Sequence, residues 1–222
     1  MVLEITLVAL ALVISLGLRP WRFLVRATAP AQSGDRRRHE PSALLTPLLA
    51  TLVVLPWMWA LPTLHRMPLQ LQWSGACLVV LMLGWPVAIP VLVGVGALAW
   101  TLSPAMDWID AIGATAWLGV VPASLGLLLG ALVRRLTGTQ PFVYVLGRAF
   151  LGTVACVFLA GLLSQWSGHA LPGVGGELSL VARWLMAWGD GFVTGMLTAI
   201  FVAFKPEWLA TWSDRLYIPR PK

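Results

Sequence analysis

PLQLQWSGACLVVLMLGWPVAIPVLVGVGALAWTL, residues 68–102, contains no charged side chain in 35 positions. As one straight helix this stretch would be about 52 Å long, whereas the hydrocarbon core of a bilayer is about 30 Å thick. It is therefore too long for one crossing and short for two. Gly84 and Pro86 lie at its midpoint, and this pairing is typical of a chain reversal. We expect two short crossings, 68–84 and 86–102.

The composition of the 222 residues agrees with a membrane protein. Hydrophobic residues make up 59% and charged residues 11%, against about 45–50% and about 25% in soluble domains. The apolar runs are nearly continuous rather than alternating, which favours helices over a barrel. The predicted fold is an all-α polytopic bundle of about seven transmembrane helices.

The whole chain, 1–222, is predicted to be a single membrane domain. The predicted spans are 2–18, 43–61, 68–84, 86–102, 111–133, 142–166 and 178–204. Between them, 19–42 is predicted to be a basic cytoplasmic loop, and 205–222 a cytoplasmic tail.

The charges between the spans predict the orientation. Two crossings within 68–102 place the arginine-rich segment 19–38, the pair Arg134–Arg135 and the basic tail on one side. Since positive loop charges gather on the cytoplasmic side, the N-terminus is expected outside and the C-terminus inside.

The net charge of +6 is explained by these topology determinants, so binding of nucleic acid is not expected. A second interpretation of Arg36, Arg37 and Arg38 is contact with lipids. A basic segment beside a membrane also attracts anionic lipid headgroups.

Three ionisable residues, Arg148, Arg183 and Asp190, fall within or close to predicted spans. Charges at membrane depth are costly and usually face a bundle interior or an aqueous cavity. Asp190, between two glycines, is the deepest. It is expected either to pair with Arg148 or to form a buried hydrogen bond that locks two helices.

Histidines are scarce, and none has a second metal ligand at helical spacing. If an external metal site exists, His65 and His169 are the pair expected to form it. No nucleophile elbow, zinc-protease motif or phosphate-binding loop is present. We therefore expect no enzymatic activity and no cofactor, and a transport role driven by ATP would need a separate ATPase subunit.

The segment after the last span mixes tryptophan with paired charges. Glu207, Trp208 and Arg215 are expected to contact lipid headgroups or a cytoplasmic partner. If docking is their role, deleting 207–222 should leave folding intact.

Four segments carry a family resemblance: LQLQWSGACLVVLMLGWP (69–86), AIGATAWLGVVPASLGLLLGALVRRL (111–136), PFVYVLGRAFLG (141–152) and GFVTGMLTAIFVAFKPEWLATWSDRLYI (191–218). They resemble the CbiM-like membrane component of cobalt and nickel energy-coupling factor transporters, and more closely a bacterial offshoot of that family. The resemblance implies about seven helices, an outside N-terminus and a location in the bacterial inner membrane.

The resemblance also implies a metal site that this sequence lacks. Family members hold the ion with the N-terminal amine, a histidine at position two and a histidine at the start of the third helix. Val2 and Gln72 stand at those histidine positions, while Thr115 and Leu118 replace asparagines expected at the fifth helix. Neither the alkyl group of Val2 nor the amide oxygen of Gln72 supplies the nitrogen donor that nickel and cobalt prefer.

Two functions follow from these patterns. The first is a substrate-binding, permease-like subunit for a small solute or metal ion, with a cavity lined by Gln72, Thr115, Arg148 and Asp190. The second is an accessory subunit of a larger membrane complex, with the ancestral cavity filled by side chains. Lipids and other membrane subunits are the expected partners.

Overall fold

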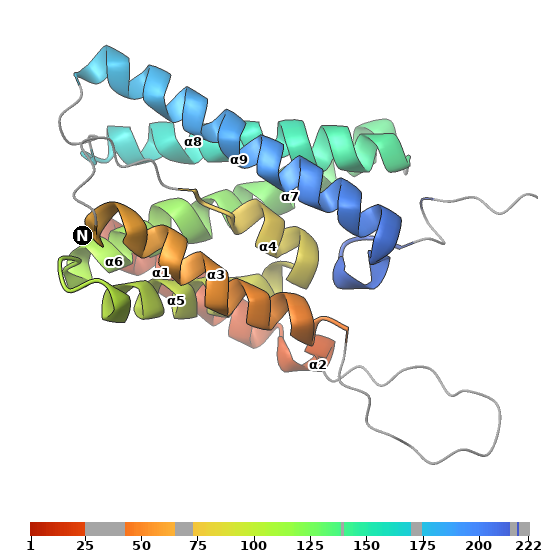
Figure 1. Ribbon diagram of the computed structural model, residues 1–222, viewed down its shortest axis with the longest axis horizontal. Coiled ribbons are helices and arrows are strands. Elements are labelled where there is room, and N and C mark those ends of the chain that lie inside the picture. The colour runs from red at the N-terminus through yellow and green to blue at the C-terminus, as the bar shows by residue number, and fades with distance from the viewer. Residues whose placement is uncertain (25–42, 65–72, 139, 170–174, 214–216, 218–222) are drawn as a thin grey trace, which may run out of the picture.

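The computed structural model describes residues 1–24, 43–64, 73–138, 140–169, 175–213 and 217 (Figure 1). Gln72, His65, Arg36, Arg37, Arg38 and Arg215 lie outside these residues. Within them every regular element is helical. The predicted all-α polytopic membrane fold is confirmed.

The elements follow one another as helices joined by short connections. In order they are α1 (Val2–Gly17), α2 (Trp21–Leu24), α3 (Leu45–Leu64), α4 (Ala76–Leu83), α5 (Trp85–Leu102), α6 (Trp108–Ala114), π-helix η1 (Thr115–Val120), α7 (Val121–Thr137), π-helix η2 (Val143–Leu151), α8 (Gly152–Trp166), α9 (Gly176–Phe204) and the 3₁₀ turn η3 (Pro206–Trp208).

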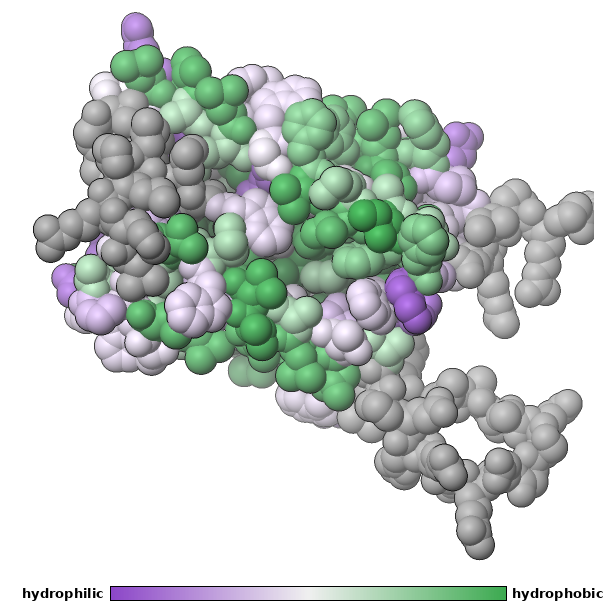
Figure 2. All heavy atoms as spheres, viewed as in Figure 1, coloured by the Kyte–Doolittle hydropathy of each residue, from purple (hydrophilic) through white to green (hydrophobic). Residues whose placement is uncertain are grey.

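Five helical segments of the described chain are long and apolar enough to cross a bilayer, and α1 is a shorter apolar helix. The five are Leu45–Thr63, Trp85–Leu102, Trp108–Thr137, Val143–Trp166 and Glu177–Phe204. Figure 2 shows mostly hydrophobic residues over the middle of one face, with hydrophilic residues gathered toward the two ends. This distribution suits a bilayer as solvent.

The segment predicted as a crossing at 68–84 contains a shorter helix. Of its described residues only Ala76–Leu83 form a helix, α4, which has 8 residues and is about 12 Å long. Its start follows Gly75, whose φ of 64° lies in the left-handed region that favours glycine. Helix α4 ends at Leu83 and α5 begins at Trp85, so the structure has a helix break at Gly84, where the sequence predicts a chain reversal.

Helix α4 lies at the centre of the bundle (Figure 1). All of its residues are buried, and it contacts α3, α5, α7, α9, η1 and η2. Such a short helix has unpaired backbone groups at both ends deep in the protein, and these groups need partners from other elements.

Glycines allow the helices around α4 to approach closely. A Cβ at Gly191 would lie 2.5 Å from Val154 Cγ2, and a Cβ at Gly195 would lie 3.0 Å from Phe150 Cβ. Gly191 and Gly195, four residues apart on α9, thus form an internal seam that joins α9 to η2 and α8.

Candidate functional site

Asp190 binds the N-terminal end of α4. The side chain is 2% exposed. Its Oδ2 accepts a hydrogen bond from the Ser74 backbone N–H at 2.8 Å, and its Oδ1 accepts one from the Gly75 N–H at 3.2 Å. A carboxylate is well placed there, because the N–H groups at a helix start are otherwise unpaired and the helix dipole favours negative charge.

Ser74 connects this junction to two further elements. Its hydroxyl donates to the Leu118 carbonyl of η1 at 2.6 Å, and its carbonyl accepts from Trp59 Nε1 of α3 at 3.2 Å. Four elements therefore meet where α4 begins: α3, α4, η1 and α9. Of the two arrangements predicted for Asp190, the structure shows the buried hydrogen bond that locks helices together.

Two threonines extend a polar face along α9 from Asp190. Thr194 and Thr198 follow at intervals of four residues, so they share a helix face with the carboxylate. Both are fully buried, and neither hydroxyl has a hydrogen-bond partner within the described residues. Our sequence interpretation did not select them, although their spacing from Asp190 was a usable signal.

Arg148 lies apart from Asp190. No carboxylate of the described residues comes within 4.0 Å of its guanidinium. The guanidinium carbon lies 5.6 Å from the centroid of the Tyr144 ring. A Cβ at Gly130 would come within 2.6 Å of Arg148 Nε, so the arginine occupies space left by that glycine.

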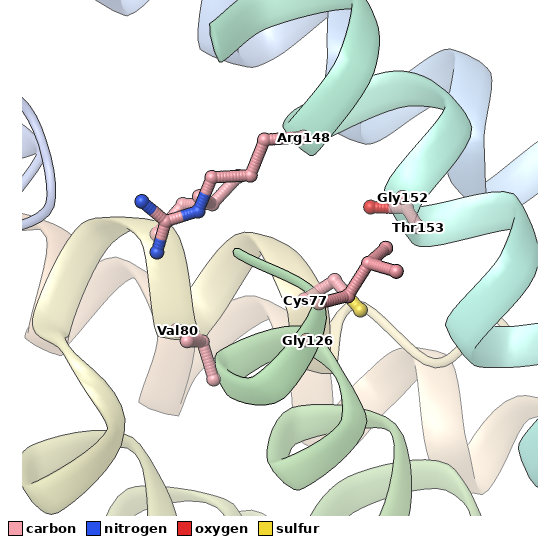
Figure 3. Close-up of a pocket in the computed structure, with 8 residues that line it drawn as sticks. Cys77, Val80, Gly126, Arg148, Gly152 and Thr153 are labelled. Atoms are coloured by element: carbon pink, nitrogen blue, oxygen red, sulfur yellow. The ribbon is translucent and has the colours of Figure 1, made fainter. Parts of the chain in front are cut away.

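A small cavity adjoins Arg148 between α4, α7, η2 and α8 (Figure 3). Its volume is about 10 Å³, which is room for about one water molecule. The lining residues are Cys77, Val80, Leu81, Gly126, Leu129, Arg148, Gly152 and Thr153. Neither Thr115 nor Asp190 lines it.

Thr115 is a packing residue in this structure. Its hydroxyl donates to the Ala111 carbonyl at 2.7 Å. A Cβ added to Gly96 would lie 1.9 Å from the same oxygen, so α5 and η1 are in close contact here. Thr115 and Asp190 are each satisfied by backbone partners. Gln72, which was also expected to line the cavity, is outside the described residues.

A second polar group lies where α1 begins. Glu4 is 2% exposed, and its Oε1 lies 3.5 Å from His169 Nε2. His169 belongs to the connection between α8 and α9, and its carbonyl accepts a hydrogen bond from Arg183 Nη2 at 2.7 Å. His169, selected from the sequence, thus has an acidic partner that was not selected.

The segment after α9 binds the other end of α4. Ala210 N–H donates to the Met82 carbonyl at 2.9 Å, and Thr211 N–H donates to the Leu81 carbonyl at 3.3 Å. The Thr211 hydroxyl also donates to Leu81 at 2.9 Å. These bonds satisfy carbonyls that a helix end leaves unpaired.

The predicted contact residues of this segment point elsewhere. Glu207 forms an exposed ion pair with Lys205 at 3.5 Å, and the Trp208 ring lies 5.5 Å from the Phe201 ring. By contrast, Leu209, Trp212 and Tyr217 are buried. These three side chains of the tail therefore pack against the helices of the same chain.

Comparison with known protein families gives a match over residues 2–208 to the family described as the cobalt uptake substrate-specific transmembrane region, CbiM. No curated protein and no solved structure matches the chain. The match includes α1, so it extends the resemblance seen in the sequence toward the N-terminus.

Proposed function

The chain belongs to this family of membrane components for cobalt uptake, and we propose that it is the substrate-specific membrane subunit of an energy-coupling factor type transporter. Its substrate class is a small solute or a metal ion. The observation that carries the proposal is the family match, which runs from the second residue into the C-terminal motif.

The interrupted pair α4–α5 supports a transport role. Discontinuous helices near mid-membrane are a recurrent way to bring helix ends and polar side chains to a solute. Here the start of α4 meets the carboxylate of Asp190 in the interior of the protein. Such a junction costs energy in a bilayer, and intramembrane ionisable groups usually serve a function.

We propose seven crossings, with the N-terminus outside and the C-terminus inside. In this proposal residues 73–75 and α4 belong to the crossing 68–84, and α5 forms the return. This arrangement puts Arg134, Arg135 and Lys205 on the cytoplasmic side of a bacterial inner membrane, as the positive-inside rule requires.

Energy for uptake comes from other subunits in this proposal. The sequence contains no phosphate-binding loop, so an ATPase module and a coupling membrane protein are the proposed partners. The chain itself carries out no catalysis and contributes substrate binding only.

A second function is favoured by the filled interior. Trp59 is fully buried between α3 and η1, where its ring would lie 3.1 Å from a Cβ at Gly119. Trp85 is also buried, and its Nε1 donates to Ser124 Oγ at 3.2 Å. Bulky side chains in these places suit an accessory subunit whose solute cavity has closed.

Gentle extraction from the native membrane followed by identification of bound proteins distinguishes the two functions. Co-purification with an ATPase, together with ATP-dependent uptake in vesicles that contain the whole complex, is the expected result. A stable complex that lacks an ATPase and takes up no metal ion or vitamin would overturn the transport proposal in favour of the accessory role.

A further inference from the structure

Arg148 carries a positive charge that no acidic side chain of the described residues neutralises. Its side chain extends from η2 in the direction away from Thr153 (Figure 3). The Nε atom is buried and has no hydrogen-bond partner within the described residues. A guanidinium has five N–H donors and no acceptor, and a charge at membrane depth usually faces a polar partner. Arg148 is therefore available to an acceptor from outside the chain.

The neighbours of Arg148 hold the guanidinium in place without neutralising it. Its carbon lies 5.6 Å from the centroid of the Tyr144 ring, whose face attracts a cation. The Thr211 hydroxyl donates to the Leu81 carbonyl at 2.9 Å, so the 2.8 Å bond between the two hydroxyls is donated by Tyr144. Gly130 leaves room for the arginine, because a Cβ there would lie 2.6 Å from Nε. The charge is thus positioned and remains unpaired.

A hollow leads from the surface to Arg148 between α7 and η2. Its lining includes Gly130, Arg134, Gly138, Tyr144, Arg148 and Tyr217. Arg134 and Gly138 are exposed whereas Tyr144 and Tyr217 are buried, so the hollow runs inward. Its volume is about 10 Å³, which is room for about one water molecule. A single oxygen atom of a larger group fits inside, and the rest of that group stays at the mouth.

The charges around the hollow select an anion. Arg134 and Arg148 line it, and no acidic residue does. Arg135 follows in the last turn of α7 and adds to the positive field at this end. The planar fork of a guanidinium matches the oxygens of a phosphate group, which it can bind through two parallel hydrogen bonds.

Exposed apolar side chains neighbour the lining residues along both helical segments. Leu132 and Leu136 of α7 are 50% and 75% exposed, and Phe142 and Leu146 at η2 are 72% and 41% exposed. In a bilayer such side chains contact hydrocarbon chains. A ligand that carries a phosphate group next to acyl chains fits both the arginines and this surface. A free phosphate ion or an acidic peptide would fit the arginines alone.

We propose that Arg148 and Arg134 bind the phosphate group of an anionic phospholipid of the cytoplasmic leaflet. One phosphate oxygen enters the hollow and accepts hydrogen bonds from Arg148, while Arg134 contacts the headgroup at the mouth. Basic pockets between transmembrane helices on the cytoplasmic side are a known type of site for such headgroups. This end of the bundle is the cytoplasmic end in the orientation proposed above. The bound lipid joins α7 to η2.

Native mass spectrometry of the purified full-length protein with phosphatidylglycerol or phosphatidylcholine tests the proposal. We expect phosphatidylglycerol to bind more tightly. Arg148→Gln should weaken its binding about tenfold or more, because charge-assisted hydrogen bonds are lost. Arg134→Gln should weaken it less, since Arg134 is exposed. The matched control is Arg135→Gln, which removes the same charge from the next residue. Arg135 does not line the hollow, so the affinity should not change.

Arg148→Lys keeps the test valid if Arg148→Gln fails to fold. It retains the charge but should still weaken binding, because a point charge replaces the planar fork. Equal affinity for the two lipids overturns the proposal. Equal losses in Arg135→Gln and Arg148→Gln also overturn it, since they would mean that the headgroup is attracted by charge without a site.

Two further arms identify the anion. Inorganic phosphate at millimolar concentration should not displace the lipid; displacement would assign the hollow to free phosphate and overturn the lipid as its source. Asp214 lies outside the described residues, and Asp214→Asn should leave binding unchanged. Tighter binding in that variant would show that the chain supplies its own anion, which also overturns the proposal. None of these results bears on co-purification with an ATPase, so the proposed function is tested separately.

Discussion

The two ends of α4 are held by neighbouring parts of the chain in different ways. At its start, the carboxylate of Asp190 accepts the N–H groups of Ser74 and Gly75. At its end, the backbone of Ala210 and Thr211 donates to the last carbonyls. The first attachment depends on a single charged side chain, and the second is spread over a segment.

This difference has a physical origin. The start of α4 lies in the interior, where the Asp190 side chain of α9 reaches the Ser74 and Gly75 N–H groups. The end of α4 is joined by the tail after α9, whose aromatic residues form a cluster with Tyr144. Trp212 and Tyr217 stack at 4.5 Å, and both rings lie about 5 Å from the Tyr144 ring, at 4.9 and 5.1 Å. One substitution can remove the first attachment, whereas the second needs a truncation.

Truncation after Trp208 is expected to have the largest effect. It removes both backbone donors and the buried side chains of Leu209, Trp212 and Tyr217. Burial of each such side chain contributes about 1.5–3 kcal/mol, so the loss approaches the about 5–15 kcal/mol that keeps a typical domain folded. Size-exclusion chromatography in detergent should show aggregated or unfolded protein.

Removal of residues 218–222 is the control for that truncation, because it keeps every contact named above. A shortened protein ending at Trp208 that stays monodisperse and as stable as this control would contradict the structural role of the tail. It would instead support the prediction from the sequence that the tail is a docking segment.

Asp190→Ala should have the next largest effect. It leaves two buried N–H groups without an acceptor, at about 1–3 kcal/mol each, and the midpoint of unfolding should fall accordingly. Asp190→Asn keeps one acceptor oxygen and should lose less. Gly189→Ala is the matched control on α9, since a Cβ there meets nothing within 4 Å. Equal stability of the two alanine variants would exclude the Asp190 attachment.

Thr211→Val should cost about 1 kcal/mol, the usual value of a hydrogen bond. It removes the hydroxyl that donates to Leu81 and lies 2.8 Å from the Tyr144 hydroxyl, while the backbone bonds remain. Tyr144→Phe removes the other partner. In a double-mutant cycle of unfolding midpoints the two losses should be less than additive. Strict additivity would mean that the two hydroxyls act separately.

Glu207→Gln should leave stability unchanged. Its ion pair with Lys205 is about half exposed on both sides, and exposed pairs contribute little. Thermal unfolding would check this expectation. A loss comparable to that of Thr211→Val would show that charge, rather than backbone bonding, holds the tail.

The sequence was sufficient to predict the long helices, because apolar length and loop charge act locally. It also indicated a break at Gly84, because the pairing of Gly84 with Pro86 is a local signal. It did not predict that α4 begins only at Ala76, because the helix start is fixed by Asp190, more than 100 residues away. Asp190 itself was recognisable as a charge within an apolar run.

Glu4 and the tail make contacts that the sequence interpretation did not identify. Glu4 stands near the end of a predicted span, where a carboxylate usually contacts water, and only the fold brings His169 to it. Trp212 and Tyr217 alternate with charged residues, as in an interfacial segment, and only the position of Tyr144 explains their burial. Both are contacts between segments that lie far apart in the sequence.

Amide hydrogen exchange of residues 73–83 tests most directly whether Asp190 holds the start of α4. In the wild-type protein the Ser74 and Gly75 amides should exchange slowly, because both are buried and bonded to the carboxylate. In Asp190→Ala they should exchange much faster, while the Gly189→Ala control keeps its protection. Equal protection of these amides in all three proteins would contradict the account.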